Sequence, residues 1–150
     1  MKTENLPIRI TLESDYLFVA PETEISVNND TVFSGKLKAG RTVIDTTQTL
    51  DLDKTHQIRI VRTGKHKKFP DQTCRVLDIN IDRISIRDLV YHNSVYYPEY
   101  PEPWASEQKE KGIELEYPVL GETVFGHNGV WCFEFYSPFY QYLINKVKGQ

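Results

Sequence analysis

Residues 77–86 read LDINIDRISI, and a leucine or isoleucine occupies every second position at the start of this stretch. Successive side chains of a β-strand point to opposite faces of a sheet, so strict alternation is typical of a strand with one buried face. The pattern predicts a strand in which Leu77, Ile79 and Ile81 face a core and the residues between them face water.

The same period of two recurs through most of the chain. It is found in Leu6-Ile8-Ile10-Leu12, Ile25-Val27, Val43-Ile44, Leu50-Leu52 and Ile58-Ile60. Asn28-Asn29-Asp30 separates Ile25-Val27 from Val32-Phe33, which predicts a hairpin. Helical periodicity is nearly absent before residue 137. Together these signals favour an all-β fold, an antiparallel β-sandwich of the jelly-roll kind.

Length and composition predict a single soluble domain over residues 1–150. The chain has 17.5 kDa, a net charge of −3 and a mean hydropathy of −0.48. These values argue against a disordered tail, a membrane protein and a dedicated nucleic-acid binder. We expect neither a signal peptide nor a transmembrane helix. Cys74 and Cys132 are expected to be reduced, half-buried side chains.

Aromatic residues gather in the last third of the sequence. Of 18 aromatic residues, 14 lie between Tyr91 and Tyr142, and four prolines fall between Pro98 and Pro118. Because proline lacks an N–H and biases its predecessor toward extended geometry, residues 91–118 are predicted to form a long loop.

The rings of this loop have two interpretations. They could cover one end of the sandwich as a satellite core, or they could be held out to bind another molecule, since tyrosine and tryptophan offer rigid, amphipathic surface. The predicted binding residues are Tyr96, Tyr97, Tyr100 and Trp104.

The chain is expected to end in a central strand followed by a short helix. Trp131, Phe133 and Phe135 share one face of that strand, and Ser137-Pro138 is a suitable helix N-cap and first-turn pair. The apolar residues that then recur at helical spacing are Phe139, Tyr140, Leu143, Ile144 and Val147.

Signatures of catalysis are absent, so we predict a non-enzymatic protein without a cofactor. Carboxylate pairs on the strands leave a glycosidase as a third, lower-ranked alternative. The four histidines lack ligand spacing and are expected at the surface; they are His56, His66, His92 and His127.

Two charged patterns have a binding interpretation and a simpler one. Asp78, Asn80 and Asp82, with Asp88 further on, could supply oxygen ligands to calcium, but a solvated strand face is equally polar and is favoured. A basic run could contact phosphate, although solvation of a hairpin tip explains it better. That run consists of Arg59, Arg62, Lys65, His66, Lys67 and Lys68.

The C-terminal half resembles small β-sandwich accessory proteins of tailed phages, over roughly residues 75–145. The resemblance lies in Tyr96-Tyr97-Pro98, Leu120-Gly121, the segment Gly126–Phe135 and Ser137-Pro138-Phe139-Tyr140 with Leu143. It implies a virion location at the capsid, neck or tail, with other virion proteins as partners and oligomerisation as a further expectation.

Residues Ile25–Ile86 separately resemble calcium-dependent xylan-binding modules. Those modules are jelly rolls with an aspartate on a terminal strand, comparable to Asp78 or Asp82 here. The first hypothesis is therefore a virion structural protein that attaches through its aromatic loop. The alternative is a carbohydrate-binding module in which the four predicted rings stack on sugars of a host-surface or plant-type glycan.

Overall fold

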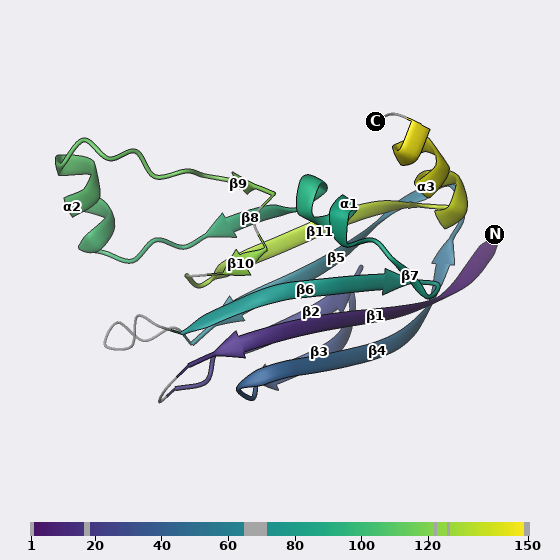
Figure 1. The fold of residues 1–150 in the computed structure, drawn as a ribbon, viewed down its shortest axis with the longest axis horizontal. Helices are drawn as coiled ribbons and strands as arrows, with labels where there is room; N and C mark the ends of the chain where they lie inside the picture. The colour runs from purple at the N-terminus through teal and green to yellow at the C-terminus, as the bar shows by residue number, and fades with distance from the viewer. Residues whose placement is uncertain (1, 17–18, 65–71, 122, 126, 149–150) are drawn as a thin grey trace.

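Two antiparallel sheets stack face to face in the computed structural model, which describes residues 2–16, 19–64, 72–121, 123–125 and 127–148 (Figure 1). The first sheet has the order β10-β6-β1-β4, with β7 paired to β6. Its strands are β1 (Thr3–Asp15), β4 (Gly40–Asp51), β6 (Thr73–Ile81), β7 (Ile84–Ser85) and β10 (Val124–Phe125).

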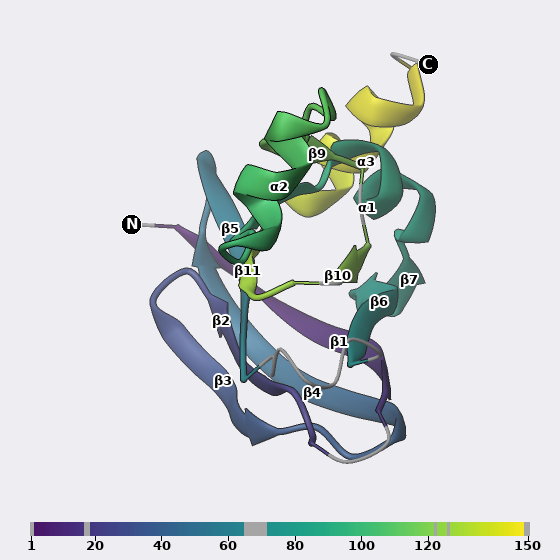
Figure 2. The same cartoon turned by 90° about the vertical axis from the view of Figure 1, so that its left-hand side faces the viewer.

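The second sheet has the order β3-β2-β5-β11-β8-β9. Its strands are β2 (Glu22–Val27), β3 (Asp30–Lys36), β5 (Lys54–Thr63), β8 (Val95–Pro98), β9 (Val119–Leu120) and β11 (Gly129–Ser137). The helices are α1 (Arg87–Asn93), α2 (Trp104–Glu110) and α3 (Phe139–Lys148). All three helices lie along one side of the sandwich in both views (Figures 1 and 2). The predicted antiparallel sandwich with a short C-terminal helix is confirmed.

Alternate residues of the long strands fill the space between the sheets, as their period predicts. In β1 the side chains of Leu6, Ile8, Ile10 and Leu12 are buried. In β11 the buried side chains are Trp131, Phe133 and Phe135. β11 pairs with β5 on one side and β8 on the other, so the prediction of a central strand is confirmed.

A bulge changes the inward row predicted for β6. Thr11 of β1 lies opposite Asp78, but the next residue, Leu12, lies opposite Val76, so Leu77 is left without a partner in the register. The extra residue reverses which side chains face inward beyond it. Val76 and Cys74 are therefore buried with Ile79 and Ile81, whereas Leu77 is half-exposed and its predicted core position is wrong.

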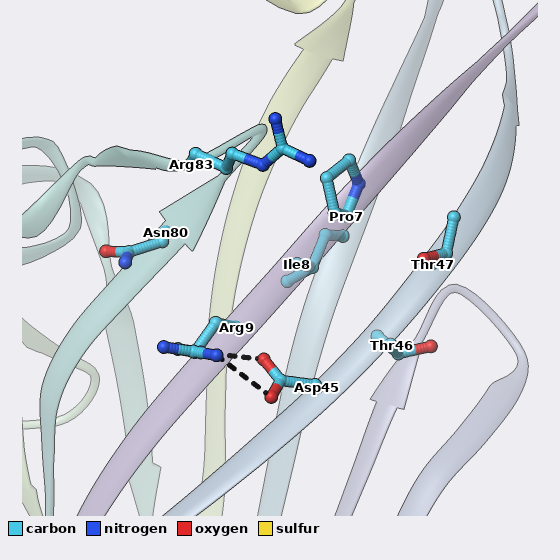
Figure 3. A pocket seen from close by; sticks show the side chains of 8 residues that line it. All are labelled: Pro7, Ile8, Arg9, Asp45, Thr46, Thr47, Asn80 and Arg83. Carbon is cyan, nitrogen blue, oxygen red and sulfur yellow. Dashed lines mark hydrogen bonds and ion pairs between the residues drawn. The ribbon is translucent and has the colours of Figure 1, made fainter.

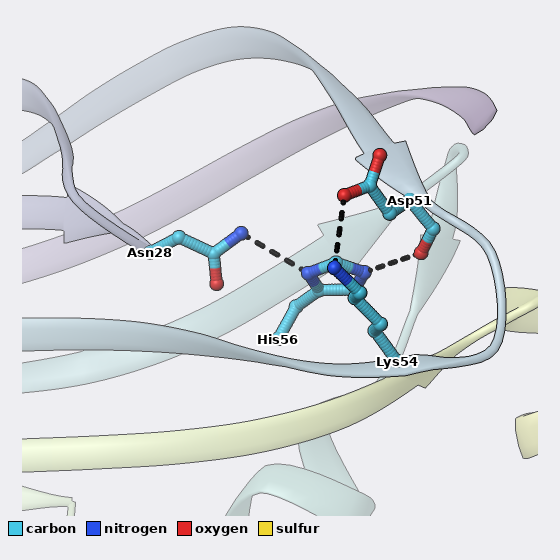
Figure 4. Close-up of polar contacts among 4 residues, drawn as sticks. All are labelled: Asn28, Asp51, Lys54 and His56. Atoms are coloured by element: carbon cyan, nitrogen blue, oxygen red, sulfur yellow. Dashed lines mark hydrogen bonds and ion pairs between the residues drawn. The ribbon is translucent and has the colours of Figure 1, made fainter. Parts of the chain in front are cut away.

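His56 is also buried, which corrects its predicted surface position (Figure 4). Its Nδ1 lies 3.0 Å from the Asn28 amide nitrogen, and its Nε2 lies 2.8 Å from the Asp51 carbonyl oxygen. The Asn28 amide oxygen accepts a bond from the Gln57 N–H, which fixes the orientation of that amide. Through these two contacts the ring joins the β2–β3 turn to the β4–β5 turn.

The helix α3 is capped by a residue far away in sequence rather than by Ser137. The Phe139 N–H donates to Glu4 Oε2 at 2.9 Å, and the Ser137 hydroxyl donates to the same oxygen. A carboxylate at a helix N-terminus satisfies a free N–H and interacts favourably with the helix dipole. The predicted apolar face is partly wrong, since Phe139 is buried but the side chains of Tyr140, Ile144 and Val147 are exposed.

No helix among the described residues has the length and apolar character needed to cross a membrane. Both cysteines are free thiols, with Cys74 buried and Cys132 half-buried.

Replacing Phe133 with alanine should lower the free energy of unfolding by about 3–5 kcal/mol, because the ring is fully buried between the sheets and its removal leaves a cavity. Chemical denaturation monitored by tryptophan fluorescence measures the change. Glu134→Ala, at the exposed neighbouring position, is the control and should change stability little. A cost for Phe133→Ala as small as that of the control would contradict the assigned core.

Candidate functional site

The predicted loop over residues 91–118 is in fact an arm that contains regular structure. It begins at the end of α1, continues as strand β8, extends beyond the sheets into helix α2 and returns to β9 (Figure 1). The prediction that this whole segment is a loop was wrong because the first proline, Pro98, is the last residue of β8, so the residues before it keep their N–H groups.

Contacts between the outgoing and returning parts hold the arm together. The Tyr100 hydroxyl donates to the Glu116 carbonyl oxygen at 2.5 Å, and the Tyr97 and Tyr117 rings meet edge-on at 5.9 Å between centroids. At the start of α2, the Ser106 hydroxyl and N–H donate to the Glu102 carboxylate at 2.6 and 3.3 Å. The arm therefore has its own internal order although no residue of α2 is buried.

Two rings of the arm, Tyr100 and Trp104, form an aromatic cluster with His127, which precedes β11. Ring centroids lie 6.1 Å apart for Tyr100 and Trp104, 5.2 Å for Tyr100 and His127, and 5.5 Å for Trp104 and His127. Trp104 is 37% exposed, and the other two rings are partly exposed. Desolvation, and then the nearby Glu116, raises the pKa of Tyr100, so its hydroxyl stays protonated and keeps its hydrogen bond to the Glu116 carbonyl oxygen.

The four predicted binding residues are divided between three places. Tyr100 and Trp104 lie in the aromatic cluster, whereas Tyr97 is 40% exposed and pairs with Tyr117 instead. Tyr96 is 3% exposed and stacks on Phe125 at 5.2 Å, so its predicted place in an exposed surface is wrong. Alternation along β8 explains this, since Tyr96 faces the core and Tyr97 faces away from it.

The base of the arm is fixed to the start of β11. Glu99 N–H donates to the Asn128 carbonyl oxygen at 2.6 Å, and the Tyr96 hydroxyl donates to the His127 carbonyl oxygen. At Gly129 a Cβ would clash with the Tyr97 carbonyl oxygen and would lie 2.9 Å from Pro98 Cα. Only glycine permits this close approach of the two strands, which sets the position of His127 beside the arm.

A buried arginine lies beneath this base. Arg62 is 1% exposed, and its Nη1 and Nη2 donate to the carbonyl oxygens of Phe125 and Gln72, each at 2.7 Å. Burial lowers the pKa of Arg62. The expectation that this residue belongs to a solvated basic run is therefore wrong, and residues 65–68 of that run lie outside the described residues.

The acidic residues considered for calcium do not converge. The Asp78 carboxylate accepts a bond from the Ser85 hydroxyl at 2.8 Å, while Asp82 lies in the β6–β7 turn and accepts a bond from the Tyr140 hydroxyl. Across the described part of the chain, no group of three or more His, Cys, Asp or Glu side chains could hold a metal ion. These residues therefore do not fit a calcium site of the kind suggested by the alternation.

Comparison with known proteins finds two solved structures with a similar fold. The selenomethionine form of vCBM60, described as linking two families of calcium-dependent carbohydrate binding modules by circular permutation, matches with a TM-score of 0.53 and 13% identity over 85% of this chain and 89% of that chain. A second structure, vCBM60 in complex with galactobiose, matches with a TM-score of 0.48 and 14% identity over 85% and 96% of the two chains. No family model and no curated protein sequence matches.

The match with a TM-score of 0.53, together with the two antiparallel sheets, confirms the predicted jelly-roll architecture. Neither matching structure is described as a phage or virion protein, so the resemblance to phage accessory proteins gains no support, and the virion location and oligomerisation stay predictions. The sequence did not single out His127 or Tyr117. Only the pairing of strands distant in sequence could have indicated His127, because it joins the site through the close contact of β8 with β11.

We expect the stability of the fold to decline as the pH rises from about 9 to about 12. Burial raises the pKa of Tyr96 from 10.0 to about 12 and that of Cys74 from 9.0 to about 12. The folded state keeps these protons at pH values where the unfolded chain loses them, so their stabilising contribution is full below about pH 9 and is lost as the pH approaches 12.

Denaturation midpoints measured across this pH range test the prediction. The double variant Tyr96→Phe with Cys74→Ala should show a shallower alkaline decline than the wild type. Tyr97→Phe, on the exposed face of the same strand, should retain the wild-type slope. Equal slopes for the wild type and the double variant would show that neither buried group is responsible.

Proposed function

We propose that this protein is a carbohydrate-binding module that holds a glycan against the aromatic cluster of Tyr100, Trp104 and His127. The observation that carries the proposal is the triangle of partly exposed rings that Tyr100 and Trp104 of the arm form with His127. A ring that the core does not need, yet that the chain holds in place, has surface to offer to another molecule.

The chemistry of these rings suits a sugar. One face of a pyranose presents C–H groups, which pack on flat aromatic surface, while its hydroxyls need donors and acceptors at the rim. The Tyr100 hydroxyl supplies an acceptor within the cluster, since its proton is donated to the Glu116 carbonyl oxygen and its lone pairs can accept a bond from a sugar hydroxyl. Tyr97 and Tyr117 continue the exposed aromatic surface along the arm.

The internal structure of the arm favours binding, since it holds the rings in place before a ligand binds. Fixing a side chain on association costs about 0.5–1.5 kcal/mol for each rotamer-rich side chain, and rings already packed on one another avoid most of that cost. The fold supports the same proposal, because the matching structure with a TM-score of 0.53 is described as a carbohydrate binding module. A glycan is thus the partner that we propose.

Replacing both Tyr100 and Trp104 with alanine should abolish binding on a glycan array, while the melting temperature stays close to that of the wild type because neither ring belongs to the core. Tyr136→Ala is the matched control, since Tyr136 is exposed to a similar extent (39%) at the other end of β11. The control should bind like the wild type.

Two results would overturn the proposal. A wild-type protein that binds no glycan on a broad array removes the function itself. A double variant that binds as well as the wild type removes the aromatic cluster as the site. Repeating the array with EDTA should leave binding unchanged, because the described acidic residues form no calcium site.

A further inference from the structure

A polar hollow lies on the outer face of the first sheet, where β6, β1 and β4 run side by side (Figure 3). Its volume is about 570 Å³, within the usual range of small-molecule sites. The side chains that the argument uses are those of Pro7, Arg9, Asp45, Thr47, Asn80 and Arg83. None of these residues belongs to the arm or the aromatic cluster.

The floor of the hollow is a row of polar side chains across three strands. Arg9 lies opposite Asp45 in the β1–β4 register and opposite Asn80 in the β1–β6 register. Arg9 Nε and Nη2 donate to the two oxygens of Asp45 at 2.8 and 3.2 Å, which is a bidentate ion pair. Hydrogen bonding from Arg9 lowers the pKa of Asp45, so the carboxylate is ionised and neutralises the charge of Arg9.

Arg83 supplies a positive charge that has no partner in the part of the chain that the structure describes. It reaches from the β6–β7 turn toward Pro7 (Figure 3), and its guanidinium makes no ion pair or hydrogen bond with any side chain that the structure describes. The side-chain amide of Asn80 likewise makes no hydrogen bond within the described ranges. Its oxygen is buried, so the amide NH2 group is the part that it can offer to a ligand. The hollow therefore carries one net positive charge together with neutral polar groups.

The backbone conformation at Arg83 is unfavourable for a residue other than glycine. Asp82 and Arg83 have φ values of 51° and 66°, so both central residues of the two-residue turn are left-handed. Asn-Gly is the usual pair in such turns, and a residue with a Cβ is disfavoured there because the Cβ comes too close to the backbone. Arg83 occupies a position that favours glycine, and no hydrogen bond or ion pair of its guanidinium with the described residues offsets the cost, which is consistent with a charge that serves a ligand.

We propose that this hollow binds the carboxylate of an acidic sugar, a uronic acid residue. The single uncompensated charge of Arg83 matches a monoanion better than a doubly charged phosphate. Asp45, Thr47 and Asn80 supply acceptors and donors for ring hydroxyls, and Pro7 offers a flat apolar surface opposite Thr47. The assignment rests on the proposed function, because it takes the ligand of the hollow to be a glycan.

Oligogalacturonate is the probe, with a neutral galactose oligomer as its matched partner. We expect amide chemical shifts of Arg9, Asn80 and Arg83 to move with oligogalacturonate and to stay still with the neutral oligomer. Arg83→Gln should weaken binding at these residues by about tenfold or more, as loss of a charged hydrogen bond predicts. Arg41→Gln removes an equal charge from β4, four residues from Asp45, and should change binding by less than about twofold.

Arg83→Gly separates a ligand role from a structural one. Glycine suits the left-handed turn, so this variant should lose oligogalacturonate binding while its melting temperature stays equal or rises. A lower melting temperature would show that the Arg83 side chain stabilises the fold and would overturn the proposal.

The remaining outcomes are equally decisive. Shifts caused to the same extent by inorganic phosphate would make the hollow a general anion site, and shifts confined to Tyr100 and Trp104 would leave it without a ligand. The double variant of Tyr100 and Trp104 keeps the two proposals apart, since it should lose binding of neutral glycans and retain the oligogalacturonate shifts at Arg83. Loss of both in that variant would overturn the separate site.

Discussion

The buried guanidinium of Arg62 connects the two sheets and fixes one end of the sandwich. Arg62 belongs to β5 of the second sheet, and it donates to the carbonyl oxygens of Phe125 in β10 and of Gln72, just before β6 of the first. A buried charge without partners is very costly. Any separation of the sheets here would expose the guanidinium or leave it buried without its hydrogen-bond acceptors. The Gln72 amide is itself held, because it donates to the Val19 carbonyl oxygen at 2.6 Å.

The aromatic cluster is positioned through this connection. Phe125, whose carbonyl oxygen Arg62 binds, stacks its ring on Tyr96 at 5.2 Å and contacts Trp131 at 6.0 Å. The Tyr96 hydroxyl then binds the backbone of His127, and the His127 ring completes the cluster with the rings of the arm. An unbroken series of packed and hydrogen-bonded groups thus runs from the core to the exposed rings, so the site inherits the rigidity of the sandwich.

Local alternation was sufficient to predict the sandwich, the β2–β3 hairpin, the core row of β1 and the buried face of β11. It failed wherever a partner distant in sequence decides the outcome. The bulge in β6 depends on pairing with β1, and the cap of α3 comes from Glu4 rather than from the adjacent Ser137. Arg62 and His56 have polar side chains that a sequence pattern assigns to the surface, and only their long-range partners allow burial.

Pairing between strands distant in sequence also decides which residues form the candidate site. Composition drew attention to the region after Tyr91, and Tyr100 and Trp104 do lie together. Whether a particular ring faces inward depends on the register of β8 against β11, which places Tyr96 in the core and brings in His127 from the other strand. The aromatic content of a segment therefore indicates where a site lies, whereas strand pairing decides which rings belong to it.

Two arginines break the ordinary rules of folding in this chain, and they do so in different ways. Arg62 breaks the rule that charges stay in water, but its hydrogen bonds to two carbonyl groups join the sheets, so the fold itself offsets the cost. Arg83 breaks the rule that left-handed turns take glycine or asparagine, and its guanidinium makes no hydrogen bond or ion pair with the described residues in return. The unfavourable burial of Arg62 is offset within the fold, so its role is structural. The unfavourable backbone conformation of Arg83 has no such offset, which is why we take the exposed arginine as the better guide to function.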